Sequence, residues 1–424
     1  MRFFFLLFIF TCTSSVFAQP AEKVYFIKVA KMYDSDKNIF VTNQQIIVRG
    51  SKIDKVGANL KKPDGAEEIN LQNCTVTPGL IDAHTHVLTI QKMDIPFEQD
   101  ELENTSIDRT LRAVKICKSF LNAGFTTIRD LGNSGMYLDL NLQKAIKKGW
   151  VEGPRMIISG PILSPEDGQY YNLAQHNRHI IEDEYTVIKN VESARQAVKD
   201  HIAQGADLIK IVMGDSRLTL PLEEVKMIVA TAHSYGLKAT AHATYDALIN
   251  RAIEAGVDGI EHGYNISDSL LDKMVKKKIY LVPTYSSKDC YLHLFEDNDK
   301  KQTPDLMQGL DEFLNASAAI TKKAFEKGVM VVNGSDMYIY SRSQGDAAKS
   351  SLAFYFDAWN KPTDILKTAT KNAAIACGID WFTGCIKEKM SADIVAFDGD
   401  MEKDFKKSLQ QVKFVMKEGQ IYVR

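Results

Sequence analysis

The central part of the chain, from position 76 to 376, repeats one pattern of apolar and polar positions. A segment with apolar residues at helical spacing ends in a glycine, and a short run rich in Val, Ile or Thr follows at once. Glycine just past a helix end takes the left-handed backbone conformation at little steric cost. The pattern therefore predicts helices that alternate with strands. The glycines that separate them are Gly124, Gly205, Gly236, Gly256 and Gly328.

The strands of this repeat are apolar without regular polar alternation, which is typical of parallel strands buried on both faces. Counting from the run that ends in Asp82, the sequence predicts eight of them. Eight such units over residues 76–376 fit an α/β fold, the (β/α)8 TIM barrel. A doubly wound open sheet is the alternative, but no G-x-G-x-x-G follows the first strand, so a nucleotide site has no support. The expected strands are 76–82, 125–130, 155–159, 206–212, 237–242, 257–262, 279–283 and 329–336.

Both ends of the chain contain short strand patterns instead. Four lie near the start, at 24–28, 46–48, 53–56 and 68–71, and three lie near the end, at 392–396, 412–416 and 420–423. Neither group alone has enough strands to bury a face. We therefore expect residues 19–75 and 377–424 to form one small β-sandwich domain built from both chain ends.

Residues 1–18 have the pattern of a secretory signal peptide. Arg2 is followed by the wholly apolar run 3–10, and V-F-A precedes an expected cleavage point after Ala18. The apolar run is too short to span a membrane. The sequence thus predicts a secreted protein, located in the periplasm, whose mature chain is not inserted in a membrane.

Composition narrows the range of partners. The chain has 45% hydrophobic and 25% charged residues and a net charge of −2, so nothing indicates binding to nucleic acid or to an anionic membrane surface. Of six cysteines, Cys12 lies in the signal segment, and the others lack C-x-x-C spacing. The sequence leaves open whether Cys377 and Cys385 form a bridge, and whether the protein is a homo-oligomer.

Candidate chemistry begins at T-P-G-L-I-D-A-H-T-H, residues 77–86. In an extended backbone, alternate residues point to the same face, so His84 and His86 can converge on one point. Neutral imidazole is the commonest protein ligand for zinc-like ions. A lone H-x-H is more often a pair of surface histidines, so the interpretation depends on further ligands at other strand ends.

Four further residues fall at or near strand ends that a barrel brings to one rim. Lys210 lies inside the apolar strand L-I-K-I-V, where its charge must be paired or lost. His242 and His262 end the next two strands, and Asp336 ends the last. Each has an ordinary structural explanation alone, such as a helix-capping role for Asp336. Together with His84 and His86 they predict a metal site.

The sequence resembles the metal-dependent amidohydrolase superfamily, in its imidazolonepropionase-like and Xaa-Pro dipeptidase (prolidase)-like branch. The resemblance rests on an ordered set of motifs over almost the whole chain after residue 76: T-P-G-L-I-D-A-H-T-H (77–86), G-A-D-L-I-K-I (205–211), A-H-A-T-Y (241–245), A-G-V-D-G-I-E-H-G (255–263), N-G-S-D (333–336), T-K-N-A-A (370–374) and A-D-I-V (392–395).

The resemblance implies two divalent metal ions, with zinc as the expected metal. It assigns His84, His86 and Asp336 to one ion and His242 and His262 to the other, with a carboxylated Lys210 (N6-carboxylysine) as the bridge. A carbamate would also replace a cation beside two cations with an anion. The implied mechanism is attack by a metal-bridging hydroxide on a carbonyl carbon, with Asp336 carrying the proton to the leaving amine.

The sequence says less about the substrate than about the metal site. The loop 160–184 contains His176 and Arg178, which could hold a substrate carboxylate, and Tyr245 could donate to the developing oxyanion. The first hypothesis is hydrolysis of an amide in a small molecule such as a dipeptide or N-acyl amino acid with a free carboxylate. Cyclic amides, lactones and phosphotriesters are alternatives for the same site. A mononuclear deaminase is a third hypothesis, disfavoured because that chemistry does not need Lys210. A non-catalytic metal-binding scaffold is a fourth, disfavoured because such proteins usually lose metal ligands and every expected ligand is present here.

Overall fold

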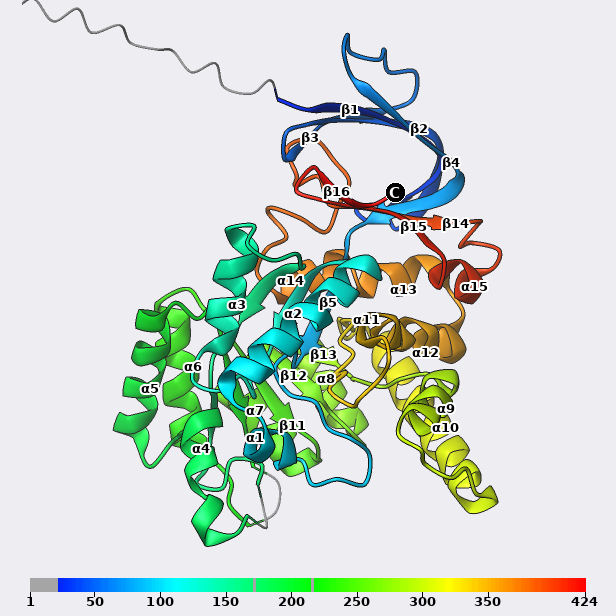
Figure 1. The fold of residues 1–424 in the computed structure, drawn as a ribbon. Coiled ribbons are helices and arrows are strands. Elements are labelled where there is room, and N and C mark those ends of the chain that lie inside the picture. Colours follow the sequence, from blue (N-terminus) through cyan, green and yellow to red (C-terminus); the bar gives the residue numbers. More distant parts are fainter. Residues whose placement is uncertain (1–21, 171–172, 215–216) are drawn as a thin grey trace, which may run out of the picture.

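The computed structural model describes residues 22–170, 173–214 and 217–424. The expected signal peptide, residues 1–18, lies outside these ranges. The described chain has two parts, a sheet made by both chain ends and a larger α/β part beneath it (Figure 1). No described helix is both long enough and apolar enough to cross a membrane. The described cysteines are all free, Cys377 and Cys385 included.

The two chain ends join in one seven-stranded sheet with the order β16-β15-β14-β4-β1-β2-β3. Strand β4 makes the junction because it pairs in parallel with β1 on one edge and antiparallel with β14 on the other. All seven strands therefore belong to a single hydrogen-bonded sheet, which curls on itself in Figure 1. The sequence predicts a small β-sandwich domain built from both chain ends, and in the structure both ends contribute to this one curled sheet. The strands are β1 (Val24–Asp34), β2 (Ile39–Arg49), β3 (Lys52–Gly57), β4 (Glu67–Pro78), β14 (Ile394–Asp398), β15 (Val412–Lys417) and β16 (Gln420–Val423).

The α/β part contains two parallel sheets, β5-β6-β7 and β13-β12-β11-β10-β8-β9. Every residue of β5, β6, β10, β12 and β13 is buried, as expected for strands covered on both faces. The bounds are β5 (Leu80–Thr85), β6 (Phe125–Asp130), β7 (Arg155–Ile158), β8 (Ile162–Ser164), β9 (Tyr185–Val187), β10 (Leu208–Val212), β11 (Lys238–Ala243), β12 (Gly259–His262) and β13 (Tyr280–Val282).

Hydrogen bonds connect the two parallel sheets at both seams. The amide of Asp207 donates to the carbonyl of Ile158 at 2.8 Å, which links β10 to β7. At the other seam Val331 forms a parallel bridge with Leu281 of β13, and the amide of Ala83 donates to the carbonyl of Asn333 at 2.9 Å. The arrangement is TIM-barrel-like. It differs from the expectation in its last segment, where 329–336 pairs through an isolated bridge and forms no regular strand.

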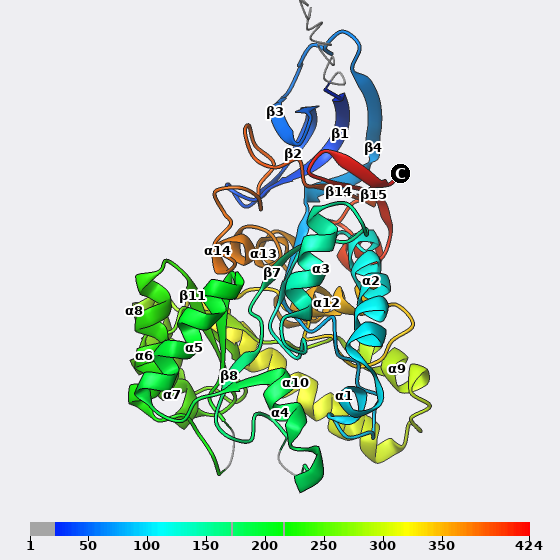
Figure 2. The ribbon, with the colours of Figure 1, turned by 60° about the vertical axis from the view of Figure 1, so that its left-hand side comes forward.

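Helices surround the parallel strands in both views (Figures 1 and 2). Gly205 and Gly256 end α5 and α7 in the left-handed conformation, with φ of 102° and 88°, as the sequence predicts. The helices are α1 (Gln99–Glu103), α2 (Ser106–Asn122), α3 (Leu138–Lys147), the 3-10 turn η1 (Gln175–Asn177), α4 (His179–Glu184), α5 (Val191–Gln204), α6 (Leu222–Ser234), α7 (Asp246–Ala255), α8 (Asp268–Lys277), α9 (Lys288–Asp297), α10 (Pro304–Glu326), α11 (Gln344–Ala348), α12 (Ser350–Trp359), α13 (Pro362–Thr368), α14 (Lys371–Ala376) and α15 (Phe405–Leu409).

A buried ion pair ties the seven-stranded sheet to the α/β part. Arg155 at the start of β7 donates to Asp393 at 3.0 Å and to Glu418 at 2.7 Å. Asp393 is 1% exposed and also accepts from the hydroxyl of Thr383. Burial alone would raise the pKa of Asp393, but Arg155 and the hydrogen bonds outweigh it and hold the pKa below its usual value.

We expect Arg155→Met to lower the free energy of unfolding by about 3 kcal/mol, because it leaves the buried carboxylate of Asp393 without its cation. Chemical denaturation followed by circular dichroism measures the change. Glu152→Ala is the matched control, since its ion pair with Lys118 is half exposed and its loss should cost within about 1 kcal/mol. Equal losses in the two variants would show that Arg155 does not stabilise the junction.

Candidate metal centre

His84 and His86 stand at the end of β5, and their Nε2 atoms lie 3.3 Å apart. The opposite nitrogen of each ring has an acceptor: Nδ1 of His84 faces a carboxylate oxygen of Glu261 at 2.7 Å, and Nδ1 of His86 faces the carbonyl of Gly132 at 2.8 Å. Each neutral ring therefore carries its proton on Nδ1 and presents an Nε2 lone pair. Two lone pairs that face one point repel each other unless a cation lies there.

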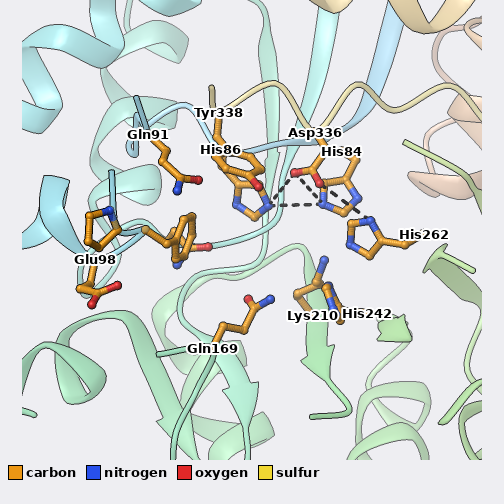
Figure 3. A pocket seen from close by; sticks show the side chains of 13 residues that line it. His84, His86, Gln91, Glu98, Gln169, Lys210, His242, His262, Asp336 and Tyr338 are labelled. Atoms are coloured by element: carbon orange, nitrogen blue, oxygen red, sulfur yellow. Dashed lines mark hydrogen bonds and ion pairs between the residues drawn. The ribbon is translucent and has the colours of Figure 1, made fainter. Parts of the chain in front are cut away.

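Asp336 brings a carboxylate to the same point. Its Oδ1 is 3.5 Å from Nε2 of His84 and 3.4 Å from Nε2 of His86, and its Oδ2 is 3.8 Å from Nδ1 of His262 (Figure 3). Ligand atoms of His84, His262 and Asp336 all lie within 4.8 Å of one another. Three such atoms that close together match the donor set of a divalent transition metal.

His262 and His242 form the other side of the site. Their rings are 4.3 Å apart between centroids, and the His262 ring is 5.0 Å from that of His84. Nδ1 of His262 contacts the hydroxyl of Thr284 at 2.8 Å, which leaves the opposite ring nitrogen available. His262 and Asp336 have φ of 72° and 51°, left-handed values that side chains other than glycine rarely adopt. Such local strain is typical of functional sites.

The four histidines are held in their neutral form. Burial lowers the pKa of His86 to about 4 and that of His242 to about 3, and the positive charge of Lys210 adds to both shifts. Burial also lowers the pKa of His84 and His262 well below the ordinary value. Neutral imidazole is the form that binds metal ions, so these rings are ready to act as ligands at neutral pH.

Lys210 points into the site from the middle of β10 and is 2% exposed. Its Nζ forms no hydrogen bond or ion pair with the part of the chain that the structure describes. Burial lowers the pKa of this amine, and Glu261 and Asp336 offset only part of that effect. Burial also raises the pKa of the Asp336 carboxyl, and the charge of Lys210 opposes the increase. The site thus contains a buried amine without a neutralising contact.

A buried network below the site holds His84 in place. Glu261 is 0% exposed, and it accepts from Arg129 at 2.7 Å as well as from the hydroxyl of Thr240. Arg129 in turn donates to the carbonyl of Ala83 at 2.6 Å. The roles of Glu261 and Arg129 are not among those that the sequence predicts. Both nevertheless share the feature that singles out Lys210 in the sequence, because each is a charged residue inside a buried strand.

These side chains open into a cavity of about 580 Å³. All six residues that the sequence predicts as ligands line it: His84, His86, Lys210, His242, His262 and Asp336. The rest of its described lining comes mainly from loops that follow the strands, and no motif in the sequence predicts it: Gln91, Pro96, Phe97, Glu98, Asn133, Gln169 and Tyr338.

The three residues that the sequence predicts to bind substrate lie elsewhere. His176 is exposed in η1, and Arg178 forms an ion pair with Asp167 at 3.2 Å. Tyr245 immediately precedes α7 and is 39% exposed. None of the three lines the cavity. Sequence position alone could not show this, because loop residues a few positions beyond a strand end can turn away from the rim.

The fold and this set of residues define a hydrolase, and its family and relatives identify carbon–nitrogen bonds as the bonds that it cleaves. The chain belongs to the amidohydrolase family, whose model matches residues 75–422. Among characterised proteins it is similar to the ochratoxinase of Aspergillus niger, with 26% identity over 81% of this chain and 75% of that protein. The fold matches a crystal structure of a Xaa-Pro dipeptidase with a TM-score of 0.80, 24% identity, and coverage of 95% of this chain and 100% of the dipeptidase.

We expect Glu261→Gln to weaken Zn²⁺ binding by about 10–100-fold, because an amide has only one acceptor oxygen for the Nδ1 proton of His84 and the guanidinium of Arg129. Competition with a chromophoric chelator measures the affinity. The substitution also leaves Arg129 without its carboxylate, so the double variant Arg129→Met/Glu261→Gln provides a charge-balanced comparison. Thr240→Val is the control, since Thr240 contacts Glu261 but not the imidazole. Unchanged affinity in folded Glu261 variants would contradict the role.

Proposed function

We propose that the protein is a binuclear-metal hydrolase that cleaves an amide bond of a small substrate such as a dipeptide or an N-acyl amino acid. The observation that carries the proposal is the convergence of four neutral histidines, Asp336 and Lys210 on one cavity. Membership of the amidohydrolase family supports the bond type. The dipeptidase activity named for a protein of the same fold agrees with a dipeptide as substrate.

We divide the ligands between the two ions as the family resemblance implies. His84, His86 and Asp336 would hold one ion, and His242 and His262 would hold the other, with zinc as the expected metal. Lys210 would bridge them as N6-carboxylysine. Its buried amine has a lowered pKa, which increases the neutral fraction that can add to carbon dioxide. The resulting carbamate is an anion and supplies oxygen ligands where the free amine repels cations.

The bound ions would lower the pKa of a water molecule to about 7 and polarise the scissile carbonyl. The chain itself supplies the proton transfer. The Asp336 carboxylate lies beside both Nε2 atoms of the His84–His86 pair and faces the cavity. We assign it the role of general base toward the attacking water and then of general acid toward the leaving amine nitrogen. Burial raises the pKa of Asp336 in the metal-free site, and a bound divalent cation would oppose that increase and keep the carboxylate ionised as a proton acceptor.

The proposal also covers the overall architecture and the cellular location of the protein. We propose a closed (β/α)8 barrel over residues 76–376, supported by the hydrogen bonds at both seams between the parallel sheets. Residues 19–75 and 377–424 would form the accompanying small β-domain. Cleavage after Ala18 would release the mature enzyme in the periplasm, where it would act on small molecules.

We expect Asp336→Asn to reduce kcat by about 10²–10⁴-fold, because the amide cannot carry the proton between water and the leaving nitrogen. Steady-state hydrolysis of a dipeptide and N-acyl amino acid panel by the zinc-loaded protein measures the loss. The exposed residue Asp305 at the start of α10 provides the control Asp305→Asn, which should leave turnover at the original level. Near-normal turnover in Asp336→Asn would contradict the assigned role.

Metal content tests the bridging role of Lys210 independently of activity. We expect two zinc ions per chain by elemental mass spectrometry in the original protein and at most one in Lys210→Met. Incubation with ¹³C-bicarbonate should give a carbamate signal by NMR that the variant lacks. Lys349→Met is the matched control, because Lys349 is also buried but pairs with Asp346 away from the site. Two ions in Lys210→Met would contradict the bridge.

A further inference from the structure

Among the described residues that line the cavity, one charged group lies away from the metal centre, and it is negative. Glu98 lines the cavity, and Figure 3 shows it at the opposite side from Lys210 and His242. The other described lining residues in this region are amides and aromatic rings, among them Gln169 and Phe97. No arginine lines the cavity within the described ranges, and the sequence places only Tyr, Asn, Asp and Ser in the two internal gaps, 171–172 and 215–216.

The carboxylate of Glu98 differs from its neighbours because it is free. Asp100 binds the guanidinium of Arg112, Glu101 accepts from the hydroxyl of Thr89, and Glu103 accepts from Gln99. Glu98 makes no side-chain hydrogen bond or ion pair with any residue that the structure describes. It is half-buried at the start of α1. A half-buried carboxylate in a cavity loses hydration without gaining a partner, and a cationic ligand would supply one.

An aromatic wall connects the metal centre to this carboxylate. The ring of His86 lies 6.2 Å from that of Tyr338, and Tyr338 lies edge to face with Phe97 at 5.6 Å, the residue that precedes Glu98. Such a surface packs well against the methylene stem of a long basic side chain, which leaves the charged end beyond it. A group that reaches Glu98 must therefore be remote from the bond held at the metals.

We propose that Glu98 selects substrates that carry a guanidinium or ammonium group at the end of a side chain, remote from the scissile amide. This inference rests on the proposed amide hydrolysis and narrows it to dipeptides or acylated amino acids with a basic side chain. This contact differs from the one that the sequence predicts, in which His176 or Arg178 holds a substrate carboxylate. Neither of those two residues lines the cavity. The negative charge of Glu98 attracts a basic group and repels an acidic one.

Matched dipeptides test the proposal. Arginine and citrulline have nearly the same shape and differ in charge, so we compare kcat/KM for alanine-containing dipeptides of each, with the variable residue on either side of the bond. We expect kcat/KM of the zinc-loaded protein to be about tenfold or more higher for the arginine peptide, with the variable residue on one of the two sides of the bond. A charge-assisted hydrogen bond to Glu98 contributes about that much. In Glu98→Gln the ratio should fall to about 1, and Glu98→Arg should favour glutamate over glutamine peptides.

Glu103→Gln is the matched control, because Glu103 lies on the same short helix but does not line the cavity, and the arginine preference should persist. Calorimetric titration of zinc-loaded Asp336→Asn protein should give the same preference as a ratio of Kd values, free of turnover. Equal rates for arginine and citrulline peptides would overturn the role of Glu98 and leave amide hydrolysis standing. Absence of hydrolysis across the whole panel would overturn the proposed function and this inference together.

Discussion

The organising constraint of the structure is the 3.3 Å separation between the Nε2 atoms of His84 and His86. Fixed acceptors at both Nδ1 atoms remove the freedom to place a proton between the rings. Protonation of either ring would relieve the repulsion, but burial disfavours the charged form of both. What remains is a pair of lone pairs that a metal ion satisfies better than any protein group nearby.

A buried ion pair next to His84 maintains this geometry. Arg129 and Glu261 are both 0% exposed and touch at 2.7 Å. A buried ion pair of this kind contributes little net stability, because desolvation offsets its attraction. Its value is geometric: Arg129 also donates to Tyr280 of β13, so a side chain from β6 connects β12 and β13 and holds the Glu261 carboxylate toward His84. His262 is also buried at the end of β12, so close packing opposes relaxation of its left-handed backbone.

The sequence predicted the parts of this arrangement that follow from period and strand ends. His84, Lys210 and His242 could be placed on one rim because parallel strands end on the same side. It did not predict that 329–336 would pair by a single bridge, since an apolar β-branched run reads the same in either case. Strands β8 and β9 were missed because each has three residues inside a loop. Cavity walls such as Phe97 and Tyr338 depend on loop paths that no periodicity encodes.

Lys210 explains how the same residues can suit both a metal-free and a metal-bound form of the site. Burial lowers the pKa of His86 and His242, and the positive charge of the Lys210 amine adds to both shifts, so these rings are neutral before a metal arrives. The same burial lowers its own pKa. In the proposed active form the neutral amine becomes a carbamate, and the group that repelled cations becomes a ligand for them. In that form, the reversal of charge at this one position would let the buried ligand set accept two divalent ions without a further acidic residue.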